Sequence, residues 1–298
     1  MSFRQVLTTL QWRDLLDQHR CRAQRWTLPA LQRRSLHISH PMADFLFTYY
    51  AFPLAKLAHW HPGWGVAMVG EGDEASWPAW WQRHYVQRGE CRFADPLTLR
   101  EKDWLRFKRT AQLLRATAER AACFSCFGMH EWAMVYRAEQ VRHAEVAPLR
   151  LSADEIAAAV EARPIRCSHF DAFRFFTPAA RPLNLLSPQA DVRHQFEQPG
   201  CVHANMDLYK WAFQGGPWVP GHLLLDAFEL ALELRELDMR ASPYDLSSWQ
   251  LEPICIETSQ GRHFYEQQQR RLAARAQVLR GELLQVYEGL LSCFRCDE

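Results

Sequence analysis

Three residues within one short segment have side chains that could do chemistry together. His203, Asp207 and Lys210 lie at positions i, i+4 and i+7 of the segment 201–214, beside the aromatic Trp211. On an α-helix this spacing puts the three side chains on one face. Such a stripe is often only the solvated side of a helix, but the aromatic neighbours favour burial. A buried stripe would offer an imidazole, a carboxylate and an amine for acid–base work or for stabilising a carbocation.

Two more segments, 126–137 and 167–176, combine histidine, carboxylate and aromatic side chains. The first is expected to be helical. The second, if extended, projects its histidine and its carboxylate to the same side. The residues concerned are His130, Glu131, Trp132 and Tyr136 in the first segment and His169 and Asp171 in the second.

Close spacing of a histidine and a carboxylate occurs three times in the chain. The pairs are His40 with Asp44, His169 with Asp171, and His203 with Asp207. Such spacing can build a metal site, and iron or zinc would suit mixed imidazole and carboxylate ligation. It can equally give a hydrogen-bonded pair that satisfies a buried imidazole. The sequence has no HExxH string or other sharp metal signature.

A charged pair continues the apolar face of a later predicted helix. Leu224, Phe228 and Ala231 form an apolar stripe, and the same face runs on to Arg235 and Asp238. Both charges therefore point toward the protein interior, where a pair is costly unless it is well hydrogen-bonded. We expect this pair to brace the site or to act as a structural clamp.

The elements that must position these residues are mainly helical. Pattern and capping signals predict a mainly α fold, with an α+β arrangement as the alternative. We expect one compact domain over 1–298 with a small, minor sheet. Residues 1–36 are expected to form a helical N-terminal extension. The expected helices are 3–25, 41–57, 75–88, 97–122, 129–142, 152–162, 203–214, 221–239 and 260–291. The expected extended runs are 147–151, 165–170 and 253–257, and 63–72 is expected to be a loop.

Composition narrows the class of protein. The 298 residues are 48% hydrophobic, enough for a sizeable core, and the net charge is only +1. A duplex-binding surface would therefore have to be a local patch of arginines. Nine cysteines are an odd, scattered set that does not suit a disulfide framework. No apolar run of about twenty residues suggests a membrane span, and the first residues do not look like a signal peptide, so we expect a cytoplasmic protein.

Long strings of the sequence resemble a bacterial family labelled 3-methyladenine DNA glycosylase. The resemblance covers roughly 37–280. It is carried by strings at His40–Tyr50, His59–Gly63, Cys126–Tyr136, His169–Pro178, Gln198–Trp211 and Glu236–Asp245.

The resemblance implies hydrolysis of an N-glycosidic bond to an alkylated or otherwise modified purine. The partner would be damaged DNA or a modified nucleobase or nucleoside. Such chemistry needs an aromatic pocket for the cationic base and a carboxylate near the sugar. The catalytic candidates are Asp207, Asp171, Lys210 and Glu131. The substrate-binding candidates are Trp132, Tyr136, Tyr209, Trp211, Arg235 and Asp238.

Two other functions fit the same residues. One is a metal-dependent enzyme acting on a small molecule or peptide, with His40, His130, His169 and His203 as ligands to iron or zinc. The other is a non-catalytic protein that binds a ligand in an aromatic pocket.

We predict that five residues from three separate segments converge on one cavity. Isolated buried polar groups each cost about 1–3 kcal/mol, so the cheapest arrangement lets them pair with one another, with water or with a metal. The residues are His130, His169, Asp171, His203 and Asp207.

Overall fold

The computed structural model describes residues 3–38, 40–70, 82–140 and 147–294. Within these ranges the chain is mainly helical with one small sheet, as the sequence predicts. The chain forms two compact units. Unit 1 comprises Met1–Gln112, Leu208–Glu229 and Leu279–Glu298, and unit 2 comprises Leu113–Asp207 and Leu230–Val278.

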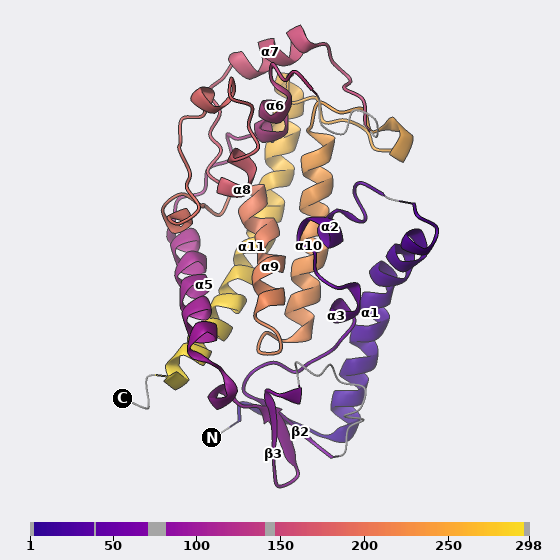
Figure 1. Ribbon diagram of the computed structural model, residues 1–298, viewed down its shortest axis with the longest axis vertical. Coiled ribbons are helices and arrows are strands. Elements are labelled where there is room, and N and C mark those ends of the chain that lie inside the picture. Colours follow the sequence, from indigo (N-terminus) through magenta and orange to yellow (C-terminus); the bar gives the residue numbers. More distant parts are fainter. Residues whose placement is uncertain (1–2, 39, 71–81, 141–146, 295–298) are drawn as a thin grey trace. The chain divides into compact units, whose positions relative to one another are not determined.

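Unit 1 contains a long N-terminal helix and the sheet. Helix α1 (Thr9–Ser35) begins with a capping box, in which Thr8 and Gln11 satisfy each other's backbone N–H groups. It lies beside the short α3 (Leu54–Leu57), and α2 (Phe45–Tyr49) precedes α3 (Figure 1). Trp12 of α1 packs with Leu7 and Met68 in a buried cluster.

The sheet has the strand order β1-β2-β4-β3. Its strands are β1 (Gln5–Leu7), β2 (Val66–Val69), β3 (Tyr85–Arg88) and β4 (Cys91–Ala94). β1 pairs with β2 in parallel, and the other pairs are antiparallel. Gly89, with φ of 59°, lies in the tight connection between β3 and β4, where glycine adopts a positive φ at little steric cost.

Unit 2 contains the short helices α6 (Met129–Val135), α7 (Ala153–Glu161) and α8 (Phe170–Phe173). Four longer helices contribute residues to both units: α5 (Glu101–Glu119), α9 (Val202–Gln214), α10 (Gly221–Arg240) and α11 (Ser259–Phe294). Within unit 2, the 230–240 part of α10 and the 259–278 part of α11 lie side by side (Figure 1), and Arg275 forms an ion pair with Glu233 at 2.6 Å. Short 3-10 turns lie at Pro96–Thr98, Arg181–Leu183, Arg193–Gln195 and Ser247–Trp249.

The best-predicted elements are the strongly periodic helices. Expected 97–122, 152–162, 203–214, 221–239 and 260–291 correspond to α5, α7, α9, α10 and α11. α7 begins with a capping box, in which Ser152 and Glu155 satisfy each other's backbone N–H groups.

Several other predicted elements are wrong. The segment 3–25 begins with a strand rather than a helix, and α1 runs on to Ser35. The predicted helix 41–57 is broken, because Ala51 adopts a φ of 53° and Pro53 follows it. The predicted loop 63–72 contains β2, and 85–88 of the predicted helix 75–88 form β3; residues 71–81 lie outside the described residues.

The remaining errors concern helix ends and extended runs. The helix predicted at 129–142 ends at Val135, since Arg137 adopts a positive φ, and 141–146 lie outside the described residues. The runs 147–151 and 165–170 form only isolated bridges, Leu149 to Tyr244 and Ile165 to Asn184. The segment 170–173 is the helix α8 rather than extended chain.

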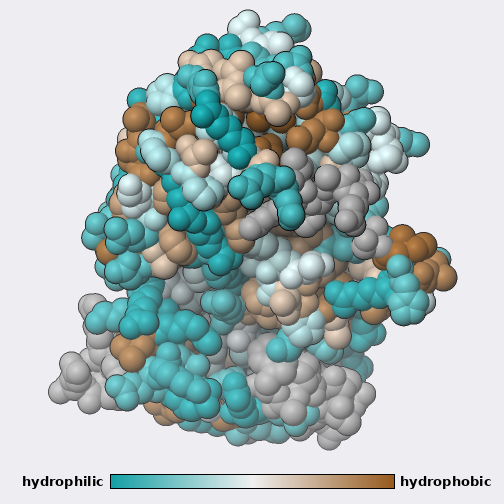
Figure 2. All heavy atoms as spheres, turned by 45° about the horizontal axis from the view of Figure 1, so that its top comes forward, coloured by the Kyte–Doolittle hydropathy of each residue, from teal (hydrophilic) through white to brown (hydrophobic). Residues whose placement is uncertain are grey.

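Three features of the described residues agree with the composition. None of the helices in the described residues combines the length and the hydropathy that a membrane-spanning segment needs. On the face shown in Figure 2, hydrophobic residues form small groups separated by hydrophilic ones. The cysteines in the described part of the chain are free thiols.

Two glycines of α11 give a matched test of its packing. A Cβ at Gly261 would stand 2.0 Å from the carbonyl oxygen of Cys255, whereas a Cβ at Gly281 would meet nothing within 4 Å. Gly261→Ala should therefore destabilise the protein by about 1–3 kcal/mol through overpacking. Gly281→Ala should stabilise it by up to about 1 kcal/mol, because alanine favours a helix. Urea denaturation measures both, and equal midpoints for the two variants would contradict this packing.

Candidate functional site

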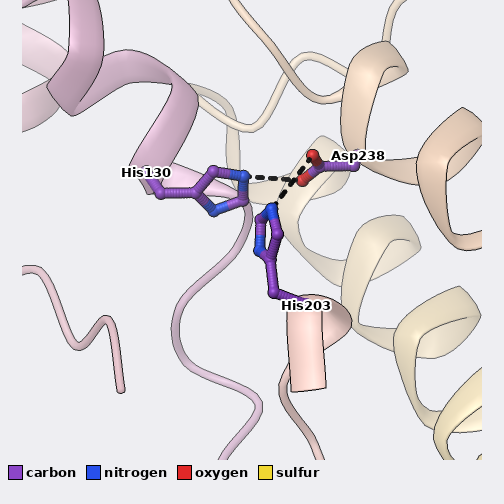
Figure 3. Close-up of side chains that lie close together, drawn as sticks. All are labelled: His130, His203 and Asp238. Atoms are coloured by element: carbon purple, nitrogen blue, oxygen red, sulfur yellow. Dashed lines mark ion pairs between the residues drawn. The ribbon is translucent and has the colours of Figure 1, made fainter. Parts of the chain in front are cut away.

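Two imidazoles and a carboxylate from three separate helices of unit 2 point at one another. In Figure 3 the rings of His130 (α6) and His203 (α9) are both directed at the carboxylate of Asp238 (α10). His130 Nε2 lies 2.8 Å from Asp238 Oδ1, and His203 Nε2 lies 3.9 Å from Asp238 Oδ2. The two rings contact edge to face, with centroids 4.3 Å apart. We call these three residues the triad.

The spacing of the triad is that of metal ligands. One ligand atom from each residue lies within 4.8 Å of the other two. Metal bonds of about 2.0–2.2 Å in tetrahedral geometry place ligand atoms about 3.3–3.6 Å apart, so small shifts would seat an ion. The side chains are well shielded, with exposed fractions of 6% for His130, 15% for His203 and 0% for Asp238.

Local sequence explains how each helix delivers its ligand. α6 starts directly after Gly128, whose φ of 72° suits glycine and whose missing Cβ allows close approach of Ala241 and Tyr265. The start of α9 is held by Asn205, whose side-chain amide donates to the carbonyl of Pro199. On α10 the apolar stripe continues to the buried Asp238, as the sequence predicts.

The charges of the triad differ. Burial lowers the pKa of His130, but the Asp238 carboxylate more than offsets it, so the net pKa is raised. Burial would raise the pKa of Asp238, but His130 and the other cations hold it below its usual range. Burial, reinforced by His130, lowers the pKa of His203 well below 6.5. His203 is therefore neutral at physiological pH and keeps a lone pair that could bind a metal.

Arg235 and Glu131 complete the surroundings of Asp238. Arg235 Nη1 donates to Asp238 Oδ2 at 3.2 Å and to Glu131 Oε1 at 3.0 Å. This confirms the predicted buried pair on α10 and adds Glu131 of α6 to it. The guanidinium links the two helices that supply His130 and Asp238.

A second group of His169, Asp171 and Asp207 lies next to the triad. One ligand atom from each member lies within 4.8 Å of the others. His169 Nε2 is 3.4 Å from Asp207 Oδ2, and the His169 ring stacks on His203 with centroids 5.5 Å apart. Burial lowers the pKa of His169, but the carboxylates of Glu197 and Asp207 outweigh it and raise the net value.

This second group already has a cation. Arg193 Nη2 donates to Asp171, and its Nη1 lies 3.7 Å from Asp207 Oδ2. Burial lowers the pKa of Arg193, but Asp171 and Asp207 raise it, so the guanidinium stays charged. A guanidinium thus lies on a carboxylate in both groups, Arg193 here and Arg235 in the triad. The triad is the better metal site because it offers two imidazoles and the second group only one.

A small cavity adjoins the triad. It has a volume of about 20 Å³. Its lining includes His130, His203 and Tyr265 and the cysteines Cys126, Cys167 and Cys201. A cavity of this size holds about one water molecule. Burial raises the pKa of each of these thiols, that of Cys167 to about 12, so they remain protonated and are poor ligands compared with the imidazoles.

The predicted convergence is confirmed in position and only partly as a cavity. His130, His169, Asp171, His203 and Asp207 come together, although Asp171 is on a helix rather than an extended strand. The cavity itself is lined by His130 and His203.

The predicted aromatic residues of unit 2 have structural partners. Trp132 is fully buried and its Nε1 donates to the carbonyl of Ala241. Tyr136 is buried, and its hydroxyl donates to Glu161.

The other predicted residues belong to unit 1. His40 Nδ1 accepts from the backbone N–H groups of Met42 and Ala43. Tyr209 is buried and packs edge to face on Phe228, and Lys210 lies over the ring of Trp211.

Sequence reasoning missed two charged residues of this site, Glu197 and Arg193. Glu197 is 2% exposed and its Oε1 lies 3.7 Å from His169 Nε2. Arg193 lies in a 3-10 turn, and Glu197 lies outside regular helices and strands. In such segments no periodic spacing marks a side chain as buried. The one available signal was their position just before the string Gln198–Trp211.

Comparison of the sequence with family models, curated proteins and solved structures finds no significant match. We therefore infer a function from the geometry of the triad and its neighbours.

The low pKa of His203 predicts a pH-dependent stability. Below pH 6.5 the unfolded chain protonates this ring while the folded chain does not, so the contribution of His203 to stability falls as the pH drops. The raised pKa of His130 acts in a different window: its contribution is complete below pH 6.5 and is lost as the pH rises through the raised value.

We expect the stability of metal-free wild type to fall between pH 6.5 and 5, and less steeply in His203→Gln. The difference in slope is at most about 1.4 kcal/mol per pH unit, the value for one proton. Urea denaturation in a chelating buffer measures both proteins. Parallel pH profiles would show that His203 is protonated in the folded protein.

Proposed function

We propose that the triad binds one divalent metal ion, iron or zinc, and that the protein is a metal-dependent enzyme acting on a small molecule or peptide. The observation that carries the proposal is the convergence of the buried His130, the partly buried His203 and the buried Asp238 from three helices. Two histidines and one carboxylate with open positions is a ligand set used by catalytic zinc and non-haem iron centres.

The surrounding residues supply what such a centre needs besides its ligands. Arg235 and Glu131 fix the orientation of Asp238, as outer partners commonly do for metal-bound carboxylates. His169, stacked on His203 and paired with Asp207, is a proton donor or acceptor beside the triad. The cavity offers room for about one water molecule, which a bound metal would make acidic.

The number of ions follows from the charges. The second group has one imidazole, and Arg193 contacts both of its carboxylates. The triad has two imidazoles on Asp238: His203 is neutral already, and His130 can release its proton when a metal binds. We therefore propose one ion per chain and not a two-metal centre.

Metal binding by the triad is directly measurable. Protein purified without chelators should contain about one metal ion per chain by elemental analysis. The apoprotein should bind Zn²⁺ in calorimetry and give a visible absorption spectrum with Co²⁺. His203→Ala and His130→Gln should each weaken Zn²⁺ binding by more than about 100-fold, because loss of an outer partner alone costs 10–100-fold.

The matched control is His263→Ala, an exposed histidine of α11 in the same unit, which should bind Zn²⁺ like the wild type. Thermal denaturation of each variant verifies folding. Clearly substoichiometric metal with no Co²⁺ spectrum, or equal Zn²⁺ affinity in folded His203→Ala, would rule out the metal centre. Turnover of ester, amide and phosphoester substrates that is lost on chelation and regained with metal would support the enzymatic half of the proposal.

N-glycosidic cleavage, which the family resemblance implies, is the second candidate. It is favoured by Asp207, a carboxylate 2% exposed and paired with His169. The burial and hydrogen bonding of Trp132 and Tyr136 leave these rings without a free stacking face, so we rank it below the metal-dependent reading. Release of 3-methyladenine from alkylated DNA that persists in chelator and is lost in Asp207→Asn would reverse that order.

A further inference from the structure

A second cavity, in unit 1, is lined by five cationic side chains. Its volume is about 410 Å³, within the range of small-molecule sites. All of its lining residues belong to unit 1, so it is separate from the triad. The cations are Lys56, Arg83, Arg100, Lys102 and Arg106.

Among the described residues, the lining contains a single carboxylate beside these five cations. Asp103 is shared by two of them, with Arg100 Nε at 3.2 Å and Arg106 Nη2 at 3.4 Å. Burial would raise the pKa of Asp103, but the hydrogen bond from Arg100 and the charge of Arg106 hold it below its usual range. In the part of the chain that the structure describes, cationic side chains of the lining therefore outnumber carboxylates by five to one.

The cavity lining also includes a neutral histidine, whose pKa is lowered by burial and by the neighbouring Arg83. His84 is buried, and its Nε2 accepts a hydrogen bond from Arg83 Nε at 3.1 Å. Burial and the charge of Arg83, with smaller contributions from Arg100 and Arg106, lower the pKa of His84 to about 4. At physiological pH the ring therefore adds no charge to the cavity wall.

The other side of the cavity is aromatic. Phe52 and Phe213 stack with ring centroids 3.8 Å apart and an interplanar angle of 3°. Trp218 is almost fully buried and meets the His84 ring edge to face. Lys56 lies between the cationic and the aromatic sides of the cavity, with its Nζ 5.9 Å from the centroid of the Phe213 ring.

We propose that this cavity binds a small phosphorylated molecule with an aromatic ring, of which a mononucleotide is the type. Guanidinium and ammonium groups are the side chains that bind phosphate oxygens, and arginine does so with two parallel hydrogen bonds. The ring of the ligand packs against Phe52 and Phe213, which are only partly buried, while the buried Trp218 lies behind them as support; stacking there is favourable whatever the base. Arg100 directly precedes α5, and Lys102 and Asp103 lie in its first turn, so the positive end of that helix adds to the attraction for an anion.

Calorimetry with adenosine monophosphate, adenosine and inorganic phosphate tests the two halves of the site. We expect the nucleotide to bind, and to bind more tightly than phosphate or adenosine alone. Arg106→Gln and Lys102→Ala should each weaken nucleotide binding about tenfold, the value of one charge-assisted hydrogen bond. Arg109→Gln, an exposed arginine on α5 that does not line the cavity, is the matched control and should bind like the wild type.

The outcomes separate clearly. Absence of nucleotide binding, or equal affinity in folded Arg106→Gln and Lys102→Ala, overturns the proposal. Phosphate that binds as tightly as the nucleotide overturns the role of the aromatic wall. Binding of duplex DNA with no binding of the mononucleotide would assign the charge to a polymer surface instead. Metal binding by the triad is measured separately, so failure of one proposal leaves the other intact.

Discussion

The buried carboxylate of Asp238 is the constraint on which the arrangement of unit 2 depends. A fully buried charge is tolerated only when it is paired and hydrogen-bonded. Asp238 obtains its partners from three helices: His130 of α6, His203 of α9 and Arg235 of its own α10. Arg235 also forms an ion pair with Glu131 of α6, so it links α10 to the helix that carries His130. Removing one partner of such a network typically costs about 3–5 kcal/mol, so the charges also determine which helices pack together.

Parts of the site could be foreseen from helical spacing, but not the triad as such, because the sequence placed His130 and His203 with His169, Asp171 and Asp207 and not with Asp238. His203 and Asp207 lie one turn apart on α9, and the apolar stripe of α10 led directly to Arg235 and Asp238. One prediction of proximity was correct although the local structure assumed for it was wrong. His169 and Asp171 were expected to share one side of an extended segment, and they lie together although Asp171 belongs to a short helix.

The sheet and part of the charged network could not be foreseen, and the causes are physical. The strands are three or four residues long, too short for alternation to be distinguished from a loop. Glu197 and Arg193 approach His169 from a segment without helical or strand periodicity. Their burial depends on contacts between residues distant in sequence, such as Gln198 with the backbone of Cys123, which no local pattern encodes.

The spacing of His203 and Asp207 on α9 has a consequence for how the chain can change during evolution. One residue inserted in the first turn of α9 would rotate everything after it by about 100° and carry Asp207 away from His169. The mostly exposed segment 185–191 can change in length at little cost, because no helical register passes through it. Divergent relatives should therefore differ in length before Arg193 while keeping the same number of residues between His203 and Asp207.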